Sequence, residues 1–204
     1  AAKSRNIGIK NSKGEFLAFL DDDDVWLPTK LEKQMPLFSN PKIGLVYSGI
    51  SLQFTEYNIS YNTKPSKKGF IYQDLLMKNY IGGTVSVIVR KKVVESFDGY
   101  EYFDPSYKAR EEYDFWIKIS KRWEIDYIYQ PLVIAYYRND IKRISSNLDN
   151  YIDAIKLLNR NYSKEIDNLL SNSQKIKRLY FQNFFLGSQA IKIYDSTLAR
   201  KYFF

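Results

Sequence analysis

Four consecutive aspartates, Asp21 to Asp24, follow directly on the apolar run Phe16-Leu17-Ala18-Phe19-Leu20. An apolar run of this length, bounded by charge, predicts a fully buried strand over 16–20. In open α/β sheets, ligands bind just beyond the carboxyl ends of such strands. Carboxylates crowded at that place repel one another unless a cation lies between them, and Mg²⁺, Mn²⁺ and Ca²⁺ suit oxygen ligands. The alternative is a solvated acidic turn.

A second acidic block, Glu111-Glu112-Tyr113-Asp114, opens a predicted helix over 111–122. The helix dipole favours acidic residues in a first turn, so helix-end charge is the alternative to a catalytic role. The chain has no His and no Cys. Acid–base chemistry must therefore use carboxylates, Lys or Tyr, and a metal site must be built from oxygen ligands.

The segment from Phe19 to Glu32, in which Trp26 and Pro28 follow the aspartates, resembles the DxD region of family-2 glycosyltransferases. These enzymes transfer sugars from nucleotide-diphosphate sugars and have the GT-A fold. The resemblance continues in further blocks, which keep the family's order over residues 1–147. They are Ala2-Lys3-Ser4-Arg5-Asn6-Ile7-Gly8, Phe97-Asp98-Gly99-Tyr100, Glu111-Glu112-Tyr113-Asp114-Phe115-Trp116, and Tyr137-Arg138 with Ser145-Ser146.

The resemblance implies a metal-dependent, inverting glycosyltransferase acting on a hydroxyl of a glycan or lipid-linked acceptor, in cell-surface polysaccharide synthesis. Asp23, with Asp24 as a second candidate, would hold Mn²⁺ or Mg²⁺. Glu112 aligns with the general base, and Asp114 is the fallback base. The expected donor-binding residues are Arg5, Asp21 and Arg138. Asp22 should point the other way, because side chains alternate in an extended segment.

The chain departs from the family pattern in three places. It opens after the strands that bind the base and ribose in the family, so residues 1–204 alone are expected to bind nucleotide sugar weakly and to be inactive. Glu112 stands where the family has Asp, which changes the reach by about one C–C bond, roughly 1.5 Å. No His follows Tyr137-Arg138, which removes a metal ligand expected of that loop.

The amino-acid composition limits which other functions the chain could have. The net charge is +8 and the pI about 9.3, which attracts phosphorylated ligands, anionic lipid or nucleic acid. The alternative function is therefore a basic nucleic-acid- or membrane-binding module without catalysis. No nucleic-acid motif is found, and the acidic run would repel phosphate, so no nucleic-acid partner is expected. The absence of Cys fits a cytoplasmic protein. The tail over 148–204, basic and with apolar residues at helical spacing, is expected to make peripheral contact with the inner face of the membrane.

The predicted fold is α/β: a GT-A-like, Rossmann-like mixed sheet flanked by helices, with a C-terminal helical appendage. The boundary is expected at 147/148, between a catalytic domain over 1–147 that lacks its N-terminal part and a helical region over 148–204. Helices are predicted over 1–12, 28–34, 72–80 and 111–122, and in the tail near 148–162, 174–186 and 188–202. Strands are predicted over 16–20, 43–54, 84–89, 125–129 and 132–137. The stretch 56–69 is expected to be a loop or ragged hairpin.

Overall fold

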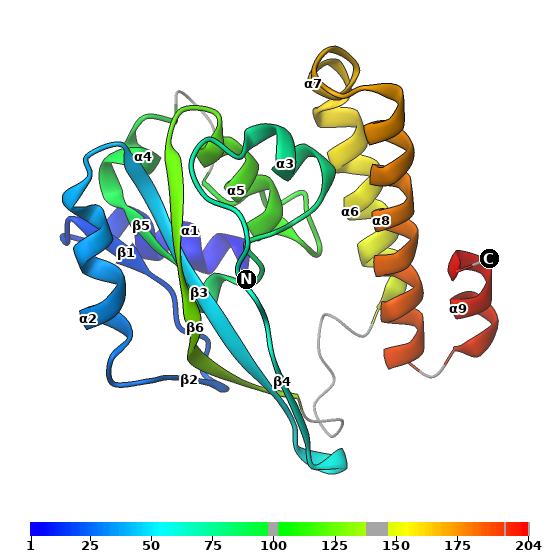
Figure 1. Ribbon diagram of the computed structural model, residues 1–204, viewed down its shortest axis with the longest axis horizontal. Helices are drawn as coiled ribbons and strands as arrows, with labels where there is room; N and C mark the ends of the chain where they lie inside the picture. The colour runs from blue at the N-terminus through cyan, green and yellow to red at the C-terminus, as the bar shows by residue number, and fades with distance from the viewer. Residues whose placement is uncertain (98–101, 138–146, 194, 204) are drawn as a thin grey trace.

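The structure is a computed structural model that describes residues 1–97, 102–137, 147–193 and 195–203. A six-stranded mixed sheet forms its centre, with helices on both faces (Figure 1). The strands are β1 (Phe16–Ala18), β2 (Asp24–Trp26), β3 (Ile43–Phe54), β4 (Ile59–Asn62), β5 (Ile88–Arg90) and β6 (Glu124–Tyr137). Their order is β1-β5-β3-β6-β2, with β4 paired to β3. Only the β3–β6 pair among these is parallel, so the mixed sheet of the predicted α/β class is confirmed.

Helices of the first part of the chain cover the two faces of the sheet. They are α1 (Ala2–Asn11), α2 (Lys30–Gln34), α3 (Tyr72–Met77), α4 (Lys91–Glu95) and α5 (Glu111–Ser120). Successive side chains of a strand point to opposite faces, and β3 uses both. Leu45 and Tyr47 join the main core with residues of α1, α3 and α5, whereas Val46 packs with Phe38 in a separate cluster beside α2.

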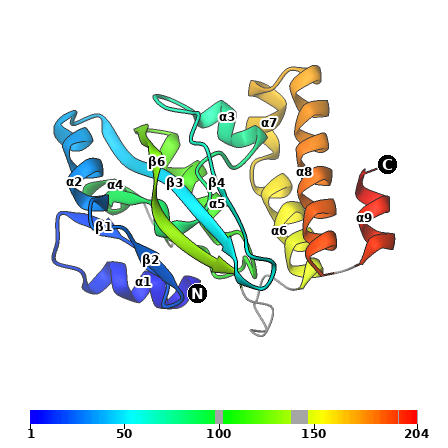
Figure 2. The same ribbon diagram turned by 60° about the horizontal axis from the view of Figure 1, so that its bottom comes forward.

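The C-terminal helices are α6 (Leu148–Asn161), α7 (Ser163–Leu169), α8 (Asn172–Lys192) and α9 (Ser196–Phe203). Figures 1 and 2 show α6, α8 and α9 side by side at the end of the molecule opposite α2. A capping box starts α8, in which the Ser171 hydroxyl accepts from the Gln174 amide at 3.3 Å. Gly187 allows α9 to approach, because a Cβ there would lie 2.8 Å from the Phe203 ring.

The helical region packs against the sheet-bearing part rather than standing apart from it. Ala154, Leu158 and Tyr162 of α6 and its end belong to the main hydrophobic core. The Arg178 Nε of α8 also donates to the Leu76 carbonyl at the end of α3, at 2.7 Å. The division into two domains at 147/148 stays a prediction.

The fully buried strand predicted over 16–20 is wrong in length and in burial. β1 ends at Ala18 and lies at an edge of the sheet, where Leu17 is buried but Leu20 is 52% exposed. The Asp24 amide donates to the Asp21 carbonyl at 3.2 Å and closes a turn over Asp22 and Asp23. Aspartate favours such turns, and this one sends β2 back to pair with β6. The alternation argument for Asp22 therefore does not apply.

The other differences between the predicted and the observed elements concern where single strands and helices begin and end. The predicted strand over 84–89 is a 3₁₀ turn at Thr84–Ser86 followed by the short β5. The two strands predicted over 125–137 are one strand, β6, whose pairing with β3 shifts register at Gly49. Helix α8 continues through Gly187 to Lys192, where two helices were predicted, because a glycine inside a helix weakens it without ending it.

Candidate functional site

The Arg5 side chain on α1 joins the two acidic blocks of the sequence. Its Nη2 donates to Asp21 Oδ1 at 2.9 Å and its Nη1 donates to Glu111 Oε1 at 2.9 Å. The guanidinium also lies 5.7 Å from the centre of the Phe103 ring. Because its planar fork engages two carboxylates at once, Arg5 fixes the acidic turn relative to the start of α5.

Asn6, the next residue on α1, holds the segment that leads into α5. Its Nδ2 donates to the Phe103 carbonyl at 2.8 Å, and its Oδ1 accepts from the Phe103 amide at 2.9 Å. Both groups are buried. A buried amide that satisfies both polar groups of one backbone residue is a specific anchor, so α1 positions this segment as well as the acidic turn.

The acidic turn places its four carboxylates differently. Asp21 faces Arg5 with its side chain 42% exposed, Asp22 and Asp23 lie in the exposed turn, and Asp24 begins β2 opposite Ala135. Within the described ranges, no three acidic side chains are grouped so that they alone could hold a metal ion. Mg²⁺ is typically bound through one or two carboxylates together with substrate phosphates, so Asp23 and Asp24 fit an ion shared with a diphosphate.

Glu112 occupies the first turn of α5, directly after Glu111. Burial, reinforced by the neighbouring charge of Glu111, raises the pKa of Glu112 to about 7, while the charges of Arg110 and Arg5 oppose the shift. Glu112 thus follows directly on Glu111, the residue that Arg5 joins to Asp21. A carboxyl group whose pKa lies near neutrality is suited to accept a proton at neutral pH.

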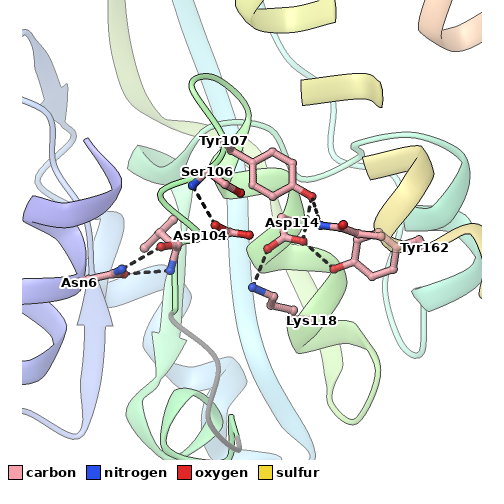
Figure 3. Close-up of polar contacts among 9 residues, drawn as sticks. Asn6, Asp104, Ser106, Tyr107, Asp114, Lys118 and Tyr162 are labelled. Atoms are coloured by element: carbon pink, nitrogen blue, oxygen red, sulfur yellow. Dashed lines mark hydrogen bonds and ion pairs between the residues drawn. The ribbon is translucent and has the colours of Figure 1, made fainter. Parts of the chain in front are cut away.

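Asp114 lies two residues further along the first turn of α5, in a different environment that is shown in Figure 3. Its Oδ1 accepts from the Tyr162 hydroxyl at 2.8 Å and from the Tyr107 hydroxyl at 3.4 Å. Its Oδ2 forms an ion pair with Lys118 Nζ at 2.7 Å, and only 2% of the side chain is exposed. Asn161 Nδ2 donates to Tyr107 at 3.1 Å and extends the network. Burial raises the pKa of both tyrosines, and the nearby Asp114 raises it further.

The structure thus brings together Arg5, Asp21 and the Glu111–Glu112 pair, and it places Asp114 in a buried network. Arg138 lies outside the described residues. Sequence reasoning missed Glu111 as an ion-pair partner, and it missed Asn6, Tyr107 and Tyr162 as anchors. The one signal in the sequence was the resemblance that marked Arg5 as a donor-binding residue. Nothing in the sequence shows that residues 106 positions apart form that pair.

The comparisons with known proteins concern the family and the fold of the chain. The sequence model described as glycosyl transferase family 2 matches residues 1–98. An uncharacterized glycosyltransferase of Haemophilus influenzae is 27% identical, over 97% of this chain and 73% of that protein. The Escherichia coli protein WfgD, described as UDP-Glc:alpha-D-GlcNAc-diphosphoundecaprenol beta-1,3-glucosyltransferase, is 29% identical, over 72% of this chain and 54% of its own length.

Among solved structures, S. aureus TarS 1–349 in complex with UDP-GlcNAc matches with a TM-score of 0.55 and 14% identity, over 100% of this chain and 69% of that one. At this level of identity the match concerns the fold. The mixed sheet and its flanking helices have the GT-A fold of this structural neighbour. Over residues 1–98 the sequence is similar to glycosyl transferase family 2, and the relatives named above are described as glycosyltransferases. No helix of the described residues is long and apolar enough to cross a membrane.

Proposed function

We propose that the protein transfers a sugar from a nucleotide-diphosphate sugar to a hydroxyl group of a glycan or lipid-linked acceptor, with inversion at the anomeric carbon. The observation that carries this proposal is the Arg5 fork, which joins Asp21 of the acidic turn to Glu111, the neighbour of Glu112. The TarS structure that shares the fold is a complex with UDP-GlcNAc, and WfgD is named for a lipid-diphosphate acceptor. Both support a nucleotide-sugar donor, and the second supports a lipid-linked acceptor in cell-surface polysaccharide synthesis.

On the donor side, Asp23 and Asp24 would hold Mn²⁺ or Mg²⁺. Such an ion supplies neutralisation of the charge that develops on the departing diphosphate. Asp21 and Arg5 complete this side, and Arg5 acts by fixing Asp21 relative to α5. We also assign to Arg138 the role predicted from the sequence, binding of the donor diphosphate.

On the acceptor side, Glu112 is the proposed general base. The acceptor hydroxyl oxygen forms a bond to the anomeric carbon, and its proton passes to a Glu112 carboxylate oxygen. The bond from the anomeric carbon to the diphosphate oxygen breaks, and its electron pair leaves with the nucleoside diphosphate. Attack on the side opposite the leaving group inverts the configuration. Asp114 is less suited to this step, since its oxygens already engage Tyr162 and Lys118.

The role of Glu112 as the base is tested by measuring turnover and donor affinity separately. Glu112→Gln keeps the shape of the side chain and removes its basicity. We expect it to lower turnover by about 10²–10⁴-fold while calorimetry shows unchanged donor affinity. Asp114→Asn is the matched control, which should retain more turnover than Glu112→Gln. Normal turnover of Glu112→Gln would reject the proposed base.

We also propose that α8 makes peripheral contact with an anionic membrane. Ile176, Leu179 and Tyr180 lie on one stripe of α8 and are 72%, 58% and 60% exposed. Lys175 and Lys177 flank that stripe, and residues 172–203 hold six Lys or Arg against one Asp. A basic helix with an exposed apolar stripe suits the interface of a bilayer that carries negative charge.

A further inference from the structure

Arg110 precedes the acidic pair of α5 in an unusual conformation. Its φ of 60° lies in the left-handed region, which is uncommon for a residue with a side chain. The guanidinium packs 4.1 Å from the centre of the Phe185 ring of α8 and 4.8 Å from that of Tyr113. It makes no hydrogen bond or ion pair with any residue that the structure describes. The backbone strain and the aromatic contacts thus hold a half-buried cation whose fork of donors remains unused.

Two further cations lie on the same side of the molecule. Arg178 of α8 uses its Nε to bind the Leu76 carbonyl at 2.7 Å. Lys78, just beyond α3, is exposed, and its Nζ lies 5.4 Å from the centre of the Tyr80 ring and 5.1 Å from that of Phe181. Within the described part of the chain, no carboxylate forms an ion pair with either residue.

We call this set the cationic aromatic surface; its cations are Lys78, Arg110 and Arg178, and its rings are Tyr80, Tyr113, Phe181 and Phe185. Burial lowers the pKa of Arg110 and of Arg178, and the charge of Arg110 lowers that of Arg178 further. Like charges in a partly desolvated setting repel strongly. An anion between them would relieve that repulsion, and guanidinium forks match phosphate oxygens in pairs.

The position of this surface relates it to the proposed chemistry. It is formed where α3, α5 and α8 meet, and Arg110 acts electrostatically on Glu112. The donor side is instead marked by the acidic turn, which Arg5 ties to the neighbouring Glu111. A ligand on this surface therefore approaches the proposed base from the region of α3 and α8.

We propose that the cationic aromatic surface binds a phosphate or diphosphate group of the acceptor and so holds the acceptor hydroxyl near Glu112. This inference rests on the proposed function for the identity of the ligand as an acceptor. The site itself, a phosphate-binding surface centred on Arg110, is tested independently of turnover.

The first experiment measures binding of inorganic pyrophosphate by calorimetry in EDTA, so that no divalent ion supports binding at the acidic turn. Arg110→Gln and Lys78→Gln should each weaken binding by about tenfold, whereas Lys92→Gln on α4 should change it less than about twofold. Lys92 is an exposed lysine that forms none of the contacts used above. Lys78 is also exposed, so its variant tests the surface even if Arg110→Gln fails to fold. Equal losses in all three variants, or no binding by the unchanged chain, would overturn the site.

The second experiment compares acceptors with and without a phosphate group in the transfer reaction. Lys78→Gln should raise KM about tenfold for the phosphate-bearing acceptor and leave KM unchanged for the phosphate-free one. Equal effects on both would overturn the acceptor assignment. Pyrophosphate binding that depends on Arg110, found in a protein with no transfer activity, would uphold the site and reject the proposed function. If the protein transfers sugar but its pyrophosphate binding does not depend on Arg110, the proposed function is upheld and the phosphate site is rejected.

Discussion

Arg5 and Glu111 lie 106 residues apart in the chain and form an ion pair of 2.9 Å. The same guanidinium holds Asp21, so α1 links the acidic turn after β1 to the first turn of α5. Both partners of the Arg5–Glu111 pair are largely buried, with 18% and 12% of their side chains exposed. Removing one partner would leave the other carboxylate or guanidinium poorly compensated, which is why the pair constrains the geometry of the site.

Metal dependence is the first prediction. The natural protein should lose nearly all transfer activity in a chelator and regain it with Mn²⁺ or Mg²⁺, because the departing diphosphate needs a cation. Asp23→Asn should reduce activity by about 10²-fold, the equivalent of a few kcal/mol. The control is Asp22→Asn in the same turn, which should lose far less. Full activity in chelator, or equal losses in the two variants, would contradict the proposed donor side.

The pH dependence of the reaction follows from the raised pKa of Glu112. A base must be ionised to accept a proton, so kcat should fall as the pH drops below about 7. Arg110→Gln removes a charge that favours ionised Glu112, so it should move this acidic limb to higher pH. A pH–rate profile that stays flat from pH 8 to pH 5 would be incompatible with Glu112 as the base.

The same shift predicts an effect on stability. Below the unfolded-state pKa of 4.5, Glu112 is protonated in both states and contributes nothing. As the pH rises towards 7, the unfolded chain ionises while the folded protein does not, so stability is lost, and the loss is complete above the folded pKa. Glu112→Gln should therefore be more stable than the unchanged chain at pH 8, by on the order of 1–3 kcal/mol, and equal to it at pH 4. Urea unfolding at the two pH values measures this, and a Glu112→Gln variant less stable at pH 8 would refute the assignment of the shift.

Asp114 should matter for stability more than for chemistry. Tyr162→Phe removes the 2.8 Å hydrogen bond to Asp114 and should destabilise the fold by about 1–3 kcal/mol. Asp114→Ala leaves Lys118 and both tyrosines without their partner and should cost more, about 3–5 kcal/mol. Tyr129→Phe, at a tyrosine that is 58% exposed, is the control and should unfold at the same urea concentration as the unchanged chain. A Tyr162→Phe variant of normal stability would show that the network contributes little.

The membrane contact of α8 predicts flotation with anionic but not with neutral vesicles. Ile176→Glu should reduce the bound fraction several-fold, because it removes an exposed apolar side chain and adds negative charge. Ile59→Glu changes another exposed isoleucine, 59% exposed on β4, and should leave flotation unchanged. Equal binding to the two kinds of vesicle, or by the two variants, would contradict the membrane contact and favour a protein partner for the exposed stripe.

The sequence predicted the elements whose signals are local and missed those set by distant partners. The helices predicted over 111–122 and near 148–162 are found as α5 and α6, and the strand predicted over 43–54 is found as β3. The acidic turn was misread as the end of a buried strand, since its conformation depends on β2 pairing with β6. Arg5, Asp21 and Glu112 were predicted as site residues from a resemblance, and their roles stay predictions. The ion pairs of Arg5 with Asp21 and Glu111 join residues far apart in the chain. The same holds for the Tyr162 hydrogen bond that gives Asp114 a different environment from Glu112.

Release of a nucleoside diphosphate from a panel of nucleotide sugars measures the proposed glycosyl transfer itself. The natural protein is incubated with Mn²⁺ and each donor in turn, and the diphosphate released is measured by a coupled assay. We expect at least one donor to be consumed, with the rate falling by about 10²-fold or more in Glu112→Gln and remaining within a few-fold of normal in Asp22→Asn. If no nucleotide sugar is consumed, or if Glu112→Gln releases the diphosphate at the normal rate, the proposed glycosyl transfer at this site is contradicted.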